Sequence, residues 1–151
     1  LDAAEATGNS SEDAAKWCSD MTGLIAAGPA AREFLQKIEQ TNGDRLPLGN
    51  TRLLAPIHPG IILCSGENYW DHREEKPEVT AKEPEFFIKI PTTGVIGPGD
   101  NIVWDPAVTQ KLDYETELAI VIGKAGRHIP EAKAAEHIFG YTIMNDVLTR
   151  S

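Results

Sequence analysis

Apolar residues recur at helical spacing in the first part of the chain. Ser10–Asp13 has the pattern of a helix start, and the apolar positions that follow predict a helix over residues 14–25. Gly28 and Pro29 then end this helix and begin a second one. The apolar stripe of the second helix consists of Ala31, Leu35 and Ile38. This part of the chain is therefore predicted to be a small helical region.

Short runs of β-type residues, separated by turn residues, make up most of the chain after Gly60. These runs predict strands, because β-branched and aromatic residues fit a pleated, half-buried surface. The predicted strands cover residues 61–65, 86–90, 101–104, 118–122 and 141–145. One helix over residues 132–138 interrupts them, with Pro130 in its first turn and Gly140 after its end.

Turn-forming residues between positions 44 and 56 mark a boundary between the two parts. Pro47, Gly49 and Asn50 favour a linker at this place. We therefore expect an N-terminal helical region with its linker over residues 1–50 and a second domain over residues 51–151. Together the two parts predict an α+β protein that is mainly β.

The charge balance excludes two classes of partner. The 151 residues carry a formal net charge of −9, and the 14 basic residues are scattered without a basic run. Nucleic-acid and anionic-membrane surfaces depend on Lys and Arg, so neither partner is expected. No apolar run approaches the roughly 20 residues of a membrane-spanning helix. Cys18 and Cys64 lack metal or disulfide spacing and are expected to be reduced core thiols, which favours a cytoplasmic protein.

Two acidic residues stand at the start of the most apolar predicted strand. Glu115 and Glu117 are alternate residues, so in a strand both point to one face. They fit either two solvent-facing residues of an edge strand or two oxygen ligands of a shared cation. Asp146 follows another predicted strand, and taken alone it is typical of a turn or capping residue.

A histidine and a carboxylate lie three residues apart after the first predicted strand. This spacing puts His72 and Glu75 on one helical face, where the carboxylate can orient the imidazole. Taken alone, the pair also fits an incidental surface contact. The charged segment over residues 73–84, which is broken by prolines, is typical of a solvated loop.

Five sequence blocks occur in the order found in the fumarylacetoacetate hydrolase family. The blocks are Pro59–His72, Glu85–Lys89, Ile96–Asp100, Lys111–Gly123 and Gly140–Asp146. From Ala55 to Ser151 the chain resembles this family, and the part of the fourth block from Leu112 onward is the most diagnostic. The resemblance implies a mixed β-roll or sandwich of the type found in the family's catalytic domain.

The resemblance also implies a set of site residues. The family's three metal-binding carboxylates, which hold Mg²⁺ or Mn²⁺ and in crystals Ca²⁺, correspond to Glu115, Glu117 and Asp146. His72 and Glu75 correspond to a catalytic dyad on a lid over residues 73–84. Lys89 corresponds to a residue near the substrate pocket.

The short branch of the family, with three carboxylates, is the better match. The larger fumarylacetoacetases have a fourth carboxylate ligand near the position of Asn68, and no acid aligns there. Relatives continue beyond the position of Ser151, so further C-terminal sequence is expected. The partners that the resemblance implies are a small 2-oxo acid substrate and a second copy of the chain in a homodimer.

The activity that the resemblance implies is metal-dependent hydrolysis of a carbon–carbon bond in an acylpyruvate-type 2-oxo acid. The cation would stabilise the enolate that forms as the bond breaks, and His72 would activate water or shuttle a proton. Within enzymes, the alternative is a decarboxylase or a keto–enol isomerase acting on the same substrate class. In another class, the alternative is a catalytically silent metal-binding or oligomerisation module.

Overall fold

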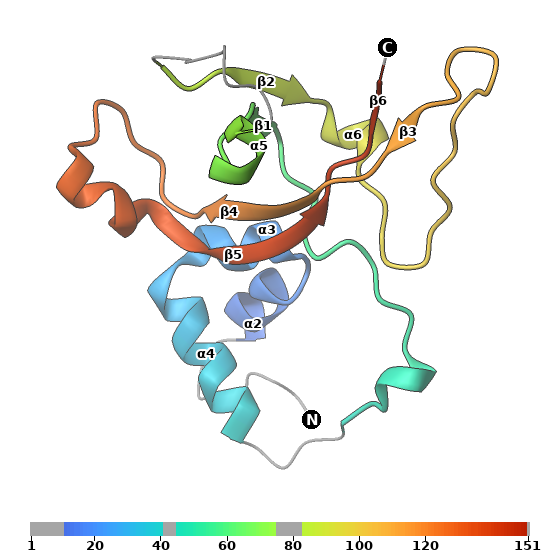
Figure 1. Cartoon of the computed structure of the whole chain (residues 1–151). Helices are drawn as coiled ribbons and strands as arrows, with labels where there is room; N and C mark the ends of the chain where they lie inside the picture. Colours follow the sequence, from blue (N-terminus) through green and yellow to red (C-terminus); the bar gives the residue numbers. More distant parts are fainter. Residues whose placement is uncertain (1–10, 41–44, 75–82, 151) are drawn as a thin grey trace. The chain divides into compact units, whose positions relative to one another are not determined.

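The computed structural model of the chain describes residues 11–40, 45–74 and 83–150. The chain divides into two compact units, one formed by residues 1–52 together with 100–151 and the other by residues 53–99. The predicted boundary at residue 50 and the extents of the two predicted domains stay predictions. Each unit is described in turn, with the elements labelled as in Figure 1.

The first unit begins with three helices, α2 (Ser11–Trp17), α3 (Met21–Ala27) and α4 (Pro29–Gln40). The prediction of one helix over residues 14–25 is wrong, because Asp20 starts a new helix within this range. Its side chain accepts a hydrogen bond from the Gly23 N–H at 2.6 Å, which satisfies a helix N–H that has no partner within the helix. Gly28, with a φ of 65°, ends α3 and allows Pro29 to open α4.

A small core holds these helices together. Phe34 is fully buried and meets Trp17 edge to face, with the ring centroids 5.4 Å apart. Ala14 and Ile38 pack in the same cluster. Leu35, predicted to lie on the apolar stripe, is instead 40% exposed, and its neighbour Phe34 fills the core.

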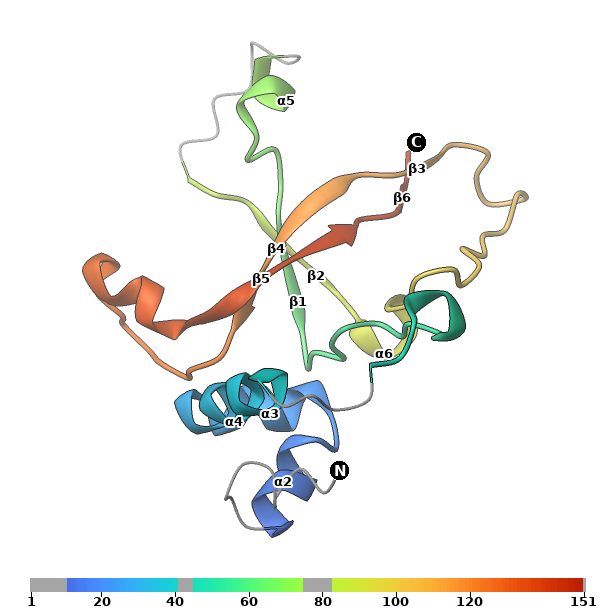
Figure 2. The ribbon, with the colours of Figure 1, turned by 90° about the horizontal axis from the view of Figure 1, so that it is seen from below.

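The strands of the first unit form one long antiparallel ribbon (Figure 2). Strand β4 (Thr116–Ile122) pairs with β5 (Ile138–Asn145), and β3 (Leu112–Asp113) pairs with β6 (Leu148–Thr149). Both pairings share a single register, which runs from Leu112 opposite Thr149 to Val121 opposite Gly140. One irregularity occurs between Val121 and Ile122.

The ribbon has one strongly exposed apolar face. Its large exposed side chains are Leu118, Ile120, Ile122, Tyr141 and Ile143. Their neighbours at alternate positions, including Glu117, Ala119 and Met144, are half-buried, so the burial follows the two-residue period of a strand. Figure 1 shows α3 and α4 beside the ribbon, and the Arg32 guanidinium of α4 donates to the Phe139 carbonyl of β5 at 3.1 Å.

Two further expectations for this unit are wrong, and the predicted helix over residues 132–138 forms with 3₁₀ geometry. The predicted strand over residues 101–104 is not formed, and Val103 within it is 88% exposed. The predicted helix over residues 132–138 is a 3₁₀ helix, η2 (Glu131–His137), and Gly140 lies inside β5. Cys18, expected in the core, is exposed just after α2.

The second unit is built on an antiparallel hairpin of β1 (Ile62–Ser65) and β2 (Phe86–Lys89). The Gly66 N–H donates to the Glu85 carbonyl at 2.9 Å and extends the pairing by one step. The short helices α5 (Trp70–Glu74) and α6 (Pro91–Gly94) follow the two strands. Cys64 is buried in β1, as predicted.

These elements confirm the predicted α+β class with an N-terminal helical region. In the described residues, six strands form three two-stranded sheets, and all six come after α2, α3 and α4 along the chain. None of the helices described is long and apolar enough to cross a membrane.

Candidate active site

The ribbon of the first unit brings three acidic residues to one face. The Asp146 N–H donates to the Glu115 carbonyl at 2.7 Å, so these two residues oppose each other in the gap between the two paired segments. Glu117 follows two positions later, opposite Met144. Directly opposed residues, and alternate residues of one strand, share a face of an antiparallel pair. We call Glu115, Glu117 and Asp146 the acidic face.

Burial of this face makes the three negative charges costly. Asp146 is only 4% exposed, and the side chain of Glu115 is 27% exposed. Carboxylates of like charge on a partly buried surface repel one another and lose hydration, so such a group requires hydrogen-bond donors or a cation. Among the described residues, every buried side-chain nitrogen or oxygen has a hydrogen-bond partner.

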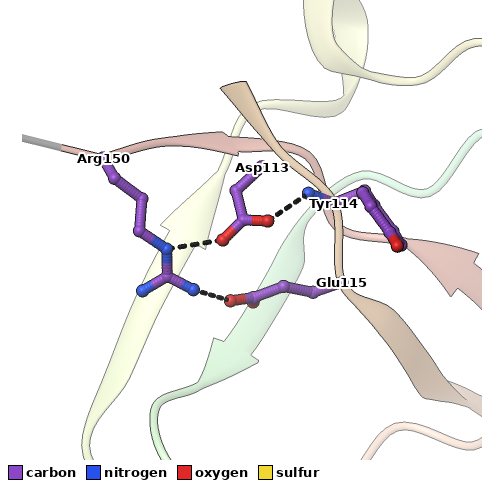
Figure 3. A network of polar contacts seen from close by, with 4 residues as sticks. All are labelled: Asp113, Tyr114, Glu115 and Arg150. Atoms are coloured by element: carbon purple, nitrogen blue, oxygen red, sulfur yellow. Dashed lines mark hydrogen bonds and ion pairs between the residues drawn. The ribbon is translucent and has the colours of Figure 1, made fainter. Parts of the chain in front are cut away.

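An arginine already supplies part of this compensation (Figure 3). Nη2 of Arg150 donates to Oε1 of Glu115 at 2.8 Å, and Nε donates to Oδ2 of Asp113 at 2.6 Å. The second oxygen of Asp113, Oδ1, accepts from the Tyr114 N–H at 3.0 Å. The Arg150 guanidinium beside Asp113 holds the pKa of that carboxyl below its usual value of 3.8, and the Tyr114 N–H acts in the same direction.

The acidic face fits a hard divalent cation by the chemistry of its donors. Carboxylate oxygens are the ligands that Mg²⁺, Mn²⁺ and Ca²⁺ prefer in proteins. The part of the chain that the structure describes contains no preformed group of three or more His, Cys, Asp or Glu side chains around a metal position. The backbone thus brings the three acidic residues together, while the Glu115 carboxylate contacts Arg150. Their assignment as metal ligands stays a prediction.

The candidate catalytic residues lie in the second unit. His72 is half-buried on α5, and Lys89 is half-buried at the end of β2, opposite Ile62. Glu75, the predicted partner of His72, lies outside the described residues, as does most of the predicted lid over residues 73–84. The catalytic roles of His72, Glu75 and Lys89 stay predictions.

Arg150 is the residue of this region to which the sequence pattern assigned no role. Its contacts with Asp113 and Glu115 join positions that are 37 and 35 residues apart along the chain. The sequence could have indicated this contact if the blocks Lys111–Gly123 and Gly140–Asp146 had been paired as antiparallel strands. Once Asp146 is aligned opposite Glu115, Arg150 falls opposite Lys111, and its N–H does donate to the Lys111 carbonyl at 2.9 Å.

Comparison with known proteins identifies the family. A sequence model of the family described as fumarylacetoacetate (FAA) hydrolase C-terminal matches residues 61–151, which is more than half of the chain. The chain belongs to the fumarylacetoacetate hydrolase family. Members of this family are enzymes, and they generally use divalent metals.

A curated relative and two solved structures illustrate this relationship. The mitochondrial oxaloacetate tautomerase FAHD2A of Bos taurus is 36% identical over 131 residues, an alignment that covers 86% of this chain and 41% of that relative. A fumarylacetoacetate hydrolase from psychrophilic Exiguobacterium antarcticum is 37% identical with a TM-score of 0.70, covering 89% of this chain and 46% of that one. A 5-carboxymethyl-2-hydroxymuconate delta-isomerase from Mycobacterium smegmatis is 44% identical with a TM-score of 0.57, covering 70% and 41%.

The chain spans about two fifths of the length of the curated relatives that it matches, with values of 38% and 41% for two of them. The structural likeness supports the predicted fold of the family's catalytic domain. The relatives' names include a hydrolase, a tautomerase and an isomerase, so members of one family carry out different reactions.

Proposed function

We propose that this protein is a divalent-metal-dependent enzyme of 2-oxo acid metabolism that hydrolyses a carbon–carbon bond of an acylpyruvate-type substrate. The observation that carries the proposal is the backbone pairing of Asp146 with Glu115, which puts both on one face with Glu117. Three carboxylates there suit Mg²⁺ or Mn²⁺, and they leave about three positions of an octahedron for substrate oxygens and water. Family membership supports the same chemistry.

Each group has a distinct role in this proposal. A bound divalent cation would supply Lewis-acid stabilisation of the negative charge that develops on the 2-oxo oxygen. Glu115, Glu117 and Asp146 hold the cation and take no proton. His72, oriented by Glu75, moves the proton, because an imidazole can both accept and release one in general acid–base catalysis. Lys89 pairs with an anionic group of the substrate.

Tautomerisation of a 2-oxo acid is a second candidate. The name of the Bos taurus relative, oxaloacetate tautomerase, favours it, and the name of the Mycobacterium smegmatis isomerase agrees with it. Hydrolysis and tautomerisation both need charge stabilisation at the 2-oxo oxygen and a proton carrier. They differ in whether a carbon–carbon bond breaks, so product analysis separates them.

The test supplies the purified protein with acylpyruvates and with oxaloacetate, in the presence and absence of Mg²⁺. A hydrolase releases two acids from an acylpyruvate, and a decarboxylase releases carbon dioxide. A tautomerase releases neither and only interconverts the keto and enol forms, which changes the ultraviolet absorbance of the solution. We expect Mg²⁺-dependent release of pyruvate from an acylpyruvate, together with the second acid. His72→Ala should lower turnover by about 10² to 10⁴-fold, the usual contribution of a general acid–base group, and leave metal affinity unchanged.

A matched variant separates metal binding from proton transfer. Glu117→Ala removes a proposed ligand, so calorimetry should show weaker Mg²⁺ binding, and activity should partly return at high Mg²⁺. Wild-type turnover by His72→Ala would refute the proposed mechanism. A protein that binds Mg²⁺ but converts none of these substrates would instead be the silent module. Mg²⁺ as the physiological ion, a homodimer and a cytoplasmic location stay predictions.

A further inference from the structure

The side edge of the Arg150 guanidinium serves two different carboxylates. Nε faces Oδ2 of Asp113 and Nη2 faces Oε1 of Glu115, and Figure 3 shows the guanidinium pointing toward both carboxylates. An arginine more often presents such an edge to both oxygens of one carboxylate. Here the two nitrogens fix the distance between the carboxylates of Asp113 and Glu115, which are two residues apart along the chain.

The arginine is itself held from two sides. Its backbone N–H donates to the Lys111 carbonyl, which continues the pairing of β3 with β6. Its guanidinium meets Asp113, whose other oxygen is held by the Tyr114 N–H. Both oxygens of Asp113 therefore accept hydrogen bonds, and Asp113 acts as an anchor. Its contact with the guanidinium, and the backbone bond to Lys111, fix Arg150 relative to the ribbon independently of Glu115.

The Glu115 carboxylate is engaged at one oxygen. Arg150 holds Oε1, and from the residues that the structure describes no hydrogen bond reaches Oε2. The charge of Arg150 would by itself repel a second cation nearby. The negative charge of Asp113 offsets it, so the pair adds no net positive charge beside the three acids of the acidic face.

We propose that Arg150 is a positioning residue for the proposed metal ligand Glu115. Anchored on Asp113, it orients the Glu115 carboxylate so that Oε2 is presented to the cation. This inference rests on the proposed function, which makes Glu115 a ligand. Groups that hydrogen-bond to metal ligands typically change metal affinity by about 10 to 100-fold when they are mutated.

The proposal requires arginine and not merely a positive charge. A lysine ammonium is a compact point charge on a flexible chain and cannot hold two carboxylates in the fixed geometry of a planar fork. Arg150→Lys therefore keeps the charge and loses the orientation. Asp113→Asn keeps the size of the anchor and loses the negative charge that pairs with Arg150.

The experiment is a calorimetric titration with Mg²⁺ alone of the wild type, Arg150→Lys, Asp113→Asn and the double variant. We expect each single substitution to raise the Kd by about 10 to 100-fold. The double variant should be no weaker than the weaker single variant, because the two residues act in series. Arg52→Lys is the matched control, since Arg52 pairs with Asp100 at 2.9 Å, and its Kd should equal that of the wild type.

Thermal unfolding without metal separates positioning from a merely structural role. If Arg150 only stabilised the fold, Arg150→Lys and Asp113→Asn would lower the melting temperature and leave the Kd within twofold of the wild type. That result, or tighter Mg²⁺ binding by either variant, would overturn the inference while the proposed function stands. Absence of Mg²⁺ binding by the wild type would overturn the proposed function itself.

Discussion

Both carboxylate oxygens of Asp113 accept hydrogen bonds from the ribbon. One donor is a guanidinium, and the other is the N–H of the next residue, Tyr114. Charge-assisted hydrogen bonds favour the ionised form of a carboxyl group, which is why its pKa is lowered. We therefore assign Asp113 as the anchor of Arg150 and not as a metal ligand.

A carboxyl titration followed by NMR tests this assignment. Asp113 should titrate below its usual pKa of 3.8, and Arg150→Gln should move the value upward, because the larger of the two favourable hydrogen bonds is lost. A lowered folded-state pKa stabilises the fold above the unfolded-state value, and this contribution disappears as the pH falls through the folded-state pKa. An Asp113 pKa that Arg150→Gln leaves unchanged would contradict the assignment.

At single positions, the sequence predicted what local spacing determines. The alternation of Glu115 and Glu117 gave their shared face. The contact between Arg150 and Glu115 could not be predicted in this way. It depends on the register between two strands, which the spacing of residues within one strand does not give.

Among the elements, α4 shows which apolar residues carry the packing of the N-terminal helices. Phe34 and Leu35 are neighbours of similar hydrophobicity, yet Phe34 is fully buried and Leu35 is 40% exposed. The helix is amphipathic, so adjacent positions point about 100° apart around its axis. Only Phe34 meets Trp17 and the small cluster around Ala14.

These two neighbours form a matched pair for a stability measurement. Phe34→Ala should lower the free energy of unfolding by about 3 to 5 kcal/mol, the usual cost of a buried aromatic truncation with its cavity. Leu35→Ala should cost much less, because a partly exposed side chain leaves little cavity. Urea unfolding followed by tryptophan fluorescence measures both. Equal losses of unfolding free energy would mean that Leu35 is buried as the sequence pattern predicts, and would contradict the observed packing of α4.

The elements that the sequence placed correctly are those with strong local patterns. Strands β1, β2, β4 and β5 were found to within a few residues at their ends. The helix break at Asp20 was missed because it depends on one side-chain cap, which the apolar pattern over residues 14–25 does not show. The strand predicted over residues 101–104 was wrong because β-type residues form a strand only where a partner strand is available, and the structure gives this segment no pairing.

On the scale of the whole molecule, the proposed metal ligands all belong to one compact unit and the candidate catalytic residues to the other. Mg²⁺ alone should therefore act mainly on the first unit. A ligand that binds only the folded state stabilises it by about 2.7 kcal/mol when its free concentration is a hundred times the Kd. Amide hydrogen exchange that requires opening of the site then slows by about 100-fold.

Hydrogen exchange with and without Mg²⁺ checks this expectation. Amides of β4 and β5 near Glu117 and Asp146 should gain protection, while fast-exchanging amides of β1 and β2 should change little. Samples with a chelator give the baseline. Protection confined to β1 and β2 would place the cation elsewhere and contradict the ligand set.

The shared register of the ribbon also determines which changes in chain length the acidic face can tolerate over evolution. Asp146 opposes Glu115 through strand pairing, so the length of the connection between β4 and β5 does not enter the geometry. The connection from Gly123 to His137 closes on itself, with the Gly123 N–H donating to the His137 carbonyl at 2.9 Å. Insertions there lengthen a loop, whereas one residue added between Glu115 and Val121 would turn the acids away from each other. A search for distant relatives should therefore fix the spacing within each acidic motif and leave the spacing between them open.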